Sequence, residues 1–129
     1  MSESRFTTTL KPIRLSESTV GLYRDGTSDV HENAQGPPRR IEGFTVGAPF
    51  MTGDAPHNGE MHPDGDELLY LVSGKIQVHV EVAGEEKSIE LTPGEAFIVP
   101  QGVWHRVHVA EPSQLVHITP GPGGEHRPL

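Results

Sequence analysis

The 129-residue chain contains no cysteine, which excludes disulfides, thiolate metal ligands and a catalytic thiol. Long apolar runs are also missing, because no segment reaches the ~18 residues that a membrane-spanning helix needs. The first twelve residues, MSESRFTTTLKP, lack the apolar centre of a secretion signal. We therefore expect a cytoplasmic protein with no membrane partner.

Basic residues are scarce. Lys and Arg number 10 against 18 Asp and Glu, and the formal net charge is -8. The basic residues are scattered, and Arg39-Arg40 is the one adjacent pair. Nucleic acids and anionic membranes both require a basic face. Neither is an expected partner of this chain.

Turn-forming residues are abundant, with 15 Gly and 12 Pro. The length indicates a single domain over residues 1–129. Residues 68–72, 76–82, 89–91, 96–99, 103–109 and 115–118 have the patterns of short β-strands, with the strand at 68–72 ending at Ser73-Gly74, and no segment has a helical period. These features predict an all-β sandwich or barrel. The two ends, residues 1–10 and 120–129, are expected to be mobile tails.

Three side chains that can bind a metal lie close together in the sequence. Glu60 and His62 are two residues apart, so they share one face of a strand. Residues 63–66, Pro-Asp-Gly-Asp, form a turn, and Glu67 begins the return strand opposite. The hairpin thus brings three candidate ligands to one end, where Asp64 and Asp66 act as turn formers.

His105 is the fourth candidate ligand. It follows a Pro-x-Gly turn and shares its strand face with Val103 and Val107, so it is expected to point into the barrel. The remaining histidines are weaker candidates: His57 for the pocket rim at most, His79, His108 and His117 for structural or exposed positions, and His31 and His126 for no role.

The sequence resembles the cupin superfamily over about residues 40–120, and two motifs carry the resemblance. His62-Pro-Asp-Gly-Asp-Glu67, with Gly74 seven residues on, resembles the first motif. The segment from Gly94 through Pro100 and Gly102 to His105 resembles the second. The resemblance implies an antiparallel jelly-roll barrel, commonly dimeric, in which Glu60, His62, Glu67 and His105 bind one divalent metal ion. Glu60 stands where the family usually has a first His.

The resemblance also implies a function. Four ligands leave one or two positions of an octahedral metal open for a substrate or dioxygen. Fe(II) or Mn(II) is favoured, with Zn(II) and Ni(II) as alternatives. The leading hypothesis is a dioxygenase-type oxidoreductase that acts on a small organic molecule. The alternatives are a non-redox lyase or isomerase, and a binding protein without turnover.

Further expectations concern Glu60, the charge of the site and the oligomeric state. Glu60 is the one candidate general base near the metal, and two carboxylates would bring a divalent site to zero net charge. A neutral site should bind anions more weakly than the site of a Glu60→His variant. A homodimer is expected, in which a copy of the chain covers outward aromatic residues such as Tyr70 or Trp104.

Overall fold

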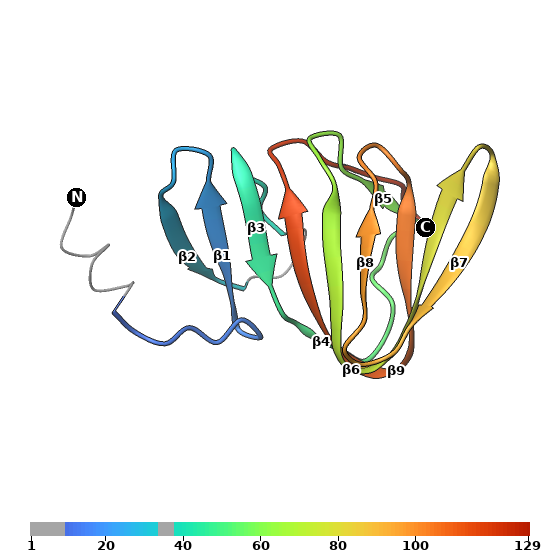
Figure 1. Ribbon diagram of the computed structural model, residues 1–129, viewed down its shortest axis with the longest axis horizontal. Helices are drawn as coiled ribbons and strands as arrows, with labels where there is room; N and C mark the ends of the chain where they lie inside the picture. Colours follow the sequence, from blue (N-terminus) through green and yellow to red (C-terminus); the bar gives the residue numbers. More distant parts are fainter. Residues whose placement is uncertain (1–9, 34–37) are drawn as a thin grey trace.

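The computed structural model describes residues 10–33 and 38–129, so the expected N-terminal tail lies outside the described residues except for Leu10. These described residues form ten strands (Figure 1). They are β1 (Ser18–Tyr23), β2 (Ser28–Glu32), β3 (Gly43–Gly47), β4 (Phe50–Met51), β5 (Glu60–Met61), β6 (Glu67–Val82), β7 (Glu85–Leu91), β8 (Ala96–Val99), β9 (His105–Pro120) and β10 (Glu125–His126). Within these ranges there is no helix long and apolar enough to cross a membrane.

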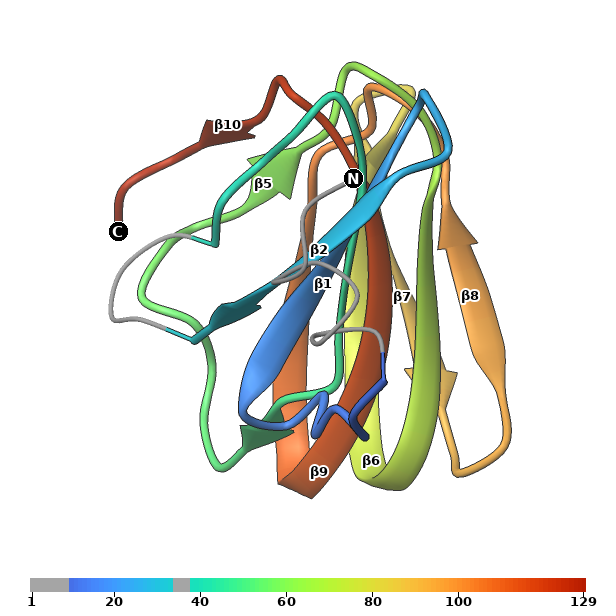
Figure 2. The same cartoon turned by 90° about the vertical axis from the view of Figure 1, so that its left-hand side faces the viewer.

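Antiparallel pairing joins the strands into one curved sheet. One path runs β10-β5-β9-β3-β1-β2, while β6 pairs with β9 and also with β7 and β8. Figure 2 shows the consequence of this curvature, because β5 and β10 lie on the side of the molecule opposite β8. The predicted all-β, antiparallel architecture is confirmed.

The two central strands are longer than the sequence pattern predicts. β6 and β9 have 16 residues each, whereas the pattern divides each of them into two shorter strands. The register of β6 against β9 shifts between Leu71 and Ile76, which marks a bulge. Gly74 lies in this bulge with a φ of 89°, and a Cβ there would collide with Ser113. The glycine therefore bends a continuous strand and does not end it.

The hydrophobic core is built by four strands of the sheet. Its members are aliphatic residues of β6, β7, β8 and β9: Leu69, Leu71, Ile76, Val78, Val80, Leu91, Val99 and Leu115. The alternation in β6 places Leu69 and Leu71 inside and Tyr70 outside, as a period of two requires. The same alternation turns Glu67 inward at the start of the strand, where it lies buried beside the core.

Two sequence predictions about the barrel rim are wrong. β5 does not pair with β6 as a hairpin, because Glu60 is instead opposite His105 of β9. The C-terminal residues include a strand, β10, in which His126 pairs with Glu60. The backbone N–H of Gly123 donates to the Asp64 carboxylate at 2.6 Å and helps to hold this segment. The sequence pattern does not predict β10, because this strand has only two residues and lies in a segment rich in Gly and Pro.

Candidate metal centre

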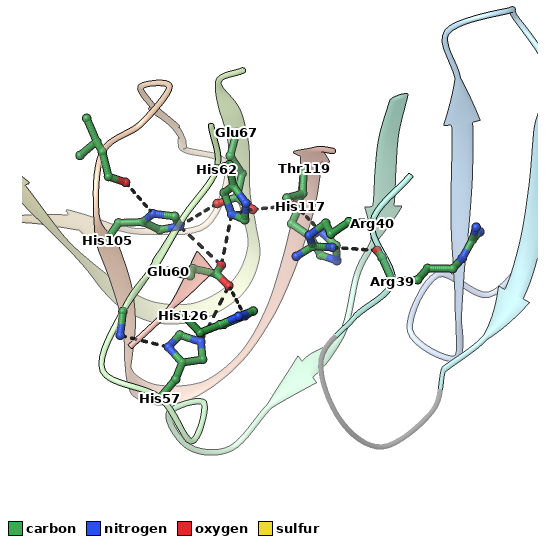
Figure 3. Close-up of polar contacts among 12 residues, drawn as sticks. Arg39, Arg40, His57, Glu60, His62, Glu67, His105, His117, Thr119 and His126 are labelled. Carbon is green, nitrogen blue, oxygen red and sulfur yellow. Dashed lines mark hydrogen bonds and ion pairs between the residues drawn. The ribbon is translucent and has the colours of Figure 1, made fainter. Parts of the chain in front are cut away.

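Four side chains from three strands and one loop converge inside the barrel (Figure 3). Glu60, His62, Glu67 and His105 each offer one ligand atom, and these atoms lie within 4.8 Å of one another. His62, Glu67 and His105 are buried, and Glu60 is partly buried. The structure therefore brings together all four residues that the sequence singles out as candidate ligands.

The two carboxylates and two imidazoles alternate around a common centre. His105 Nε2 lies 3.0 Å from Glu67 Oε1 and 3.5 Å from Glu60 Oε1. His62 Nε2 lies 3.4 Å from Glu60 Oε1 and 3.5 Å from Glu67 Oε2. Such separations are close to the roughly 3 Å between neighbouring ligands of an ion with bonds of about 2.1 Å.

His62 provides the clearest test of whether the cluster suits a metal. Both of its ring nitrogens are buried, and neither has a hydrogen-bond partner among the described residues. Buried polar atoms nearly always have a hydrogen-bond partner, so an imidazole that faces two carboxylates without a hydrogen bond to either needs an explanation. A divalent transition metal ion satisfies Nε2 directly, and imidazole and carboxylate are suitable donors for such an ion. The residues present thus fit the metal that the resemblance implies.

His105 is oriented by the backbone. Its Nδ1 lies 3.2 Å from the carbonyl oxygen of Val103, to which an Nδ1–H donates. Without a metal, Nε2–H donates to Glu67 Oε1 at 3.0 Å, whereas in a neutral ring Nε2 presents a lone pair on this same side. An imidazole held in this way is typical of metal-binding histidines.

A second set of residues supports Glu67. The Thr119 hydroxyl donates to Glu67 Oε2 at 2.6 Å, and His117 Nδ1 lies 2.9 Å from the same hydroxyl oxygen. Because Thr119 has one hydroxyl proton and gives it to the carboxylate, His117 Nδ1–H must be the donor to Thr119. The neutral His117 ring therefore carries its lone pair on Nε2. Burial lowers the pKa of His117, which favours this neutral form.

The outer side of Glu60 is also supported. Glu60 Oε2 lies 3.4 Å from His126 Nε2 and 3.9 Å from His57 Nε2. His57 Nδ1 accepts a hydrogen bond from the backbone N–H of Gly59 at 3.1 Å, so the neutral ring carries its proton on Nε2. His57 therefore presents a donor, and not a lone pair, to Glu60. We interpret His57 and His126 as groups that orient Glu60.

The predictions for the other polar residues vary in outcome. Asp66 accepts a hydrogen bond from the backbone N–H of Gln101 at 2.8 Å, which connects its loop to the turn at residues 101–102. His57 lines the cavity, as expected of a rim residue. Sequence reasoning missed His117, Thr119 and His126 as neighbours of the site. Alternation along β9 could have revealed the first two, since Leu115, His117 and Thr119 share one face.

Without a metal, the cluster is a network of ion pairs. Burial alone would lower the pKa of His105, but hydrogen bonds and charges from Glu60 and Glu67 raise it to about 10. Burial alone would raise the pKa of Glu67, but His105 and His62 lower it to about 2. The same balance holds the pKa of Glu60 well below its ordinary value and raises that of His62. Protons on the imidazoles thus take the place of the cation.

A cavity of about 740 Å³ lies against the cluster. Glu60, Glu67 and His105 are part of its wall, with His117 and Thr119 beside them. Apolar residues make up much of the remaining wall, namely Met51, Leu69, Val107, Val109 and Leu115. A space of this size suits a small organic molecule.

A comparison with protein families supports the sequence resemblance. A family model described as a cupin domain matches residues 50–119, which include all four candidate ligands. No curated protein matches the chain in sequence.

Solved structures share the fold at low sequence identity. Peruvianin-I, a cysteine peptidase from Thevetia peruviana latex, has a TM-score of 0.56 and 20% identity over 67% of this chain and 56% of its own. Oxalate decarboxylase from Bacillus subtilis, studied for its Mn(II) centres, has a TM-score of 0.56 and 20% identity over 64% of this chain and 23% of its own. HppE with Co(II) and substrate has a TM-score of 0.51 and 18% identity over 60% and 45%.

These likenesses concern the fold. They support the jelly-roll barrel expected from the sequence, and each covers less than two thirds of the compared protein's length. The peptidase is a clear example of how little else follows, because this chain has no cysteine. Function has to be argued from the site itself.

Proposed function

The chain belongs to the cupin domain family, and we propose that it is a metal-dependent enzyme acting on a small organic molecule. The observation that carries the proposal is the buried cluster of four potential ligands on the wall of a ligand-sized cavity. Glu60, His62, Glu67 and His105 would hold one divalent ion, with Fe(II) or Mn(II) favoured over Zn(II) and Ni(II). Such an ion with an open position supplies Lewis-acid or redox chemistry.

The surrounding residues have separate tasks in this proposal. Thr119 fixes Glu67 by its hydrogen bond, and His126 with His57 fixes the outer oxygen of Glu60. The apolar wall excludes water from the substrate. Glu60 is the most exposed of the four candidate ligands and is therefore the best placed to exchange a proton with a substrate.

We favour oxidation of the substrate by dioxygen, with both oxygen atoms entering the product. A test begins with metal-free protein incubated with Fe(II) or Mn(II) and desalted. We expect one ion per chain, and oxygen uptake when a suitable small organic substrate is added. His62→Ala should lose the ion. His79→Ala is the control, because His79 bonds Ser88 at 2.7 Å away from the cluster.

Equal metal retention by wild type and His62→Ala, or no retention by wild type, would overturn the proposed metal centre. Oxygen uptake addresses the reaction separately. A loaded protein that converts a substrate without consuming oxygen would contradict the oxidative reaction and leave the metal centre in place.

His117 favours a second candidate, a non-redox lyase or isomerase. Its neutral ring has a lone pair on Nε2, and the residue lines the cavity beside Thr119. Such a group can take a proton from a substrate that the metal polarises. Conversion under strict exclusion of oxygen that is lost in a His117→Phe variant, with metal content unchanged, would favour this reaction over oxidation.

A further inference from the structure

Three arginines line the cavity, and they differ in their partners. Arg106 lies 3.3 Å from a carboxylate oxygen of Glu86. Arg127 pairs with Glu81 and stacks on Trp104, with 4.1 Å between its guanidinium carbon and the ring centroid. Arg40 has no carboxylate within ion-pair distance in the part of the chain that the structure describes. Its Nη1 donates to the backbone carbonyl of Arg39 at 3.2 Å.

The fold holds Arg40 close to the metal cluster. Figure 3 shows it near His117 and Thr119, on the side of the cluster away from His57 and His126. The chain after β9 packs against it, because a Cβ added to Gly121 would lie 3.2 Å from Arg40 Cβ. Arg40 is partly buried, and its guanidinium stays charged in any environment of this kind.

The charges at the site leave Arg40 uncompensated once a metal is bound. Glu60 and Glu67 are the acids whose charges act on Arg40. Both are also candidate metal ligands, and their two negative charges cancel those of a divalent ion. Neutral imidazoles add nothing, so Arg40 gives this end of the cavity a net charge of +1. The neutral site expected from the ligands alone is therefore incomplete, because it omits Arg40.

A carboxylate complements this arrangement. Its two oxygens match the planar fork of a guanidinium, and its single negative charge equals the excess at the site. The rest of the cavity wall is largely apolar, as its lining by Leu69, Val107 and Leu115 shows. A phosphate dianion would exceed the positive charge, and a neutral molecule would leave Arg40 without a partner.

We propose that the cavity takes a small organic acid with an apolar body, whose carboxylate is bound by Arg40. The inference extends the proposed function by naming the class of its substrate. Arg40 acts as a specificity-determining residue, and the metal ligands act on the remainder of the molecule. The predicted ligand is monoanionic at neutral pH and occupies a cavity of about 740 Å³.

The test compares benzoate with benzamide, a neutral molecule of nearly the same shape. Calorimetry is carried out on metal-loaded and metal-free wild type, Arg40→Met and Arg106→Met. Benzoate should bind wild type at least about tenfold more tightly than Arg40→Met, because the truncation removes a charge-assisted bidentate contact. Arg106→Met, whose arginine already has Glu86 as partner, should stay within about twofold of wild type. Benzamide should bind wild type and Arg40→Met equally.

An Arg40→Lys variant guards against a folding artefact, since it keeps the charge and loses the fork. It should bind benzoate with intermediate affinity and melt like wild type. Equal benzoate affinity in wild type and Arg40→Met would overturn the inference, as would equal losses in Arg40→Met and Arg106→Met. Metal content, measured in the same samples, tests the proposed function independently of benzoate binding.

Discussion

Glu60 differs from the other candidate ligands because its two carboxylate oxygens have different surroundings. Oε1 faces His62 and His105 inside the cluster, and Oε2 faces His126 at 3.4 Å on the outer side. A histidine at position 60 could not accept a hydrogen bond from His126 on the outer side while it binds a metal inside the cluster, because a neutral imidazole has only one lone pair for either purpose. Glu60 and its outer histidines therefore form one unit beside the cluster.

Thr119 provides the sharpest single-residue prediction. Its hydroxyl is the hydrogen-bond donor to the buried Glu67, so Thr119→Val leaves that carboxylate without the donor. We expect metal affinity to fall by about 10- to 100-fold, as for other groups that orient a ligand. The free energy of unfolding should fall by about 1–3 kcal/mol. A chelator competition and urea denaturation measure the two effects.

Thr45→Val is the matched control for this prediction. Thr45 is the cross-strand neighbour of Thr119 and is equally buried, but its hydroxyl donates to the Arg39 carbonyl at 3.2 Å. The Thr45→Val variant should be less stable than wild type and should keep the metal affinity of wild type. Similar metal affinities in the two variants would show that Thr119 does not orient a ligand.

The ionisable groups predict how stability depends on pH. The pKa of His105 is raised from 6.5 to about 10, so its contribution is complete below pH 6.5 and is lost as the pH rises through 10. The pKa of Glu67 is lowered from 4.5 to about 2, so its contribution is complete above pH 4.5 and is lost as the pH falls through 2. The metal-free protein should therefore be most stable between pH 4.5 and 6.5.

Metal should change the alkaline half of this profile. Bound imidazoles are neutral, so the loaded protein has no imidazolium to lose, and its affinity for metal should increase with pH. Melting temperatures measured from pH 5 to 9 in chelated and loaded samples test both statements. If the melting temperatures of the chelated and loaded samples change with pH in the same way, the cluster does not bind the ion.

Sequence reasoning was most successful for residues whose spacing is fixed by local geometry. His62 and Glu67 lie on either side of one turn, and His105 follows another, so short-range rules were sufficient to select them. Arg40 could not be selected in this way, because its position depends on packing against Gly121, which is 81 positions away in the chain. His126 escaped for a similar reason, since its strand is defined by a partner near residue 60.

At the level of elements, β10 should be required for a fully formed metal centre. It pairs with β5 and places His126 beside Glu60. Deleting residues 124–129 should weaken metal binding by about tenfold or more and lower the melting temperature, because β5 loses a neighbour. His126→Ala keeps the strand. Its metal affinity should fall nearly as far as in the deletion, whereas its melting temperature should stay close to that of wild type. Unchanged metal affinity in the deletion would contradict this role.

The observed strand bounds show which strands local sequence rules predict correctly and which they do not. The sequence pattern predicts β8 with its observed bounds, Ala96–Val99, because turns with Pro and Gly define both of its ends. The sequence pattern predicts two strands in place of β6, because Gly74 is normally a sign of a strand end, and two in place of β9, at residues 103–109 and 115–118. Their continuity comes from pairing with each other across the bulge, which is information that neither strand contains alone.

At the level of the whole molecule, one outer face of the sheet is apolar, and we propose that it forms a homodimer. Leu22 pairs with Phe44 across β1 and β3, and Tyr70 lies beside Val116 across β6 and β9. Tyr70 is 39% exposed and Ile98 is 56% exposed. Trp104 is not a free contact, because Arg127 covers its ring. A second copy would remove this surface from water.

Light scattering tests the dimer directly. Wild type should have twice the chain mass of 14.0 kDa at micromolar concentration. Tyr70→Lys should shift the mass toward a single chain. Val82→Lys is the control, since Val82 is 40% exposed at the far end of β6, and it should remain dimeric. A single-chain mass for wild type would exclude the dimer.

The central claim is that one divalent ion is bound by Glu60, His62, Glu67 and His105. Crystals grown with Co(II) and measured at the cobalt absorption edge test it most directly, because the anomalous signal locates the metal independently of the protein atoms. We predict one strong peak per chain, within about 2.0–2.3 Å of one donor atom from each of the four side chains. A peak between His57, Glu60 and His126, or no peak beside His62, would contradict the claim.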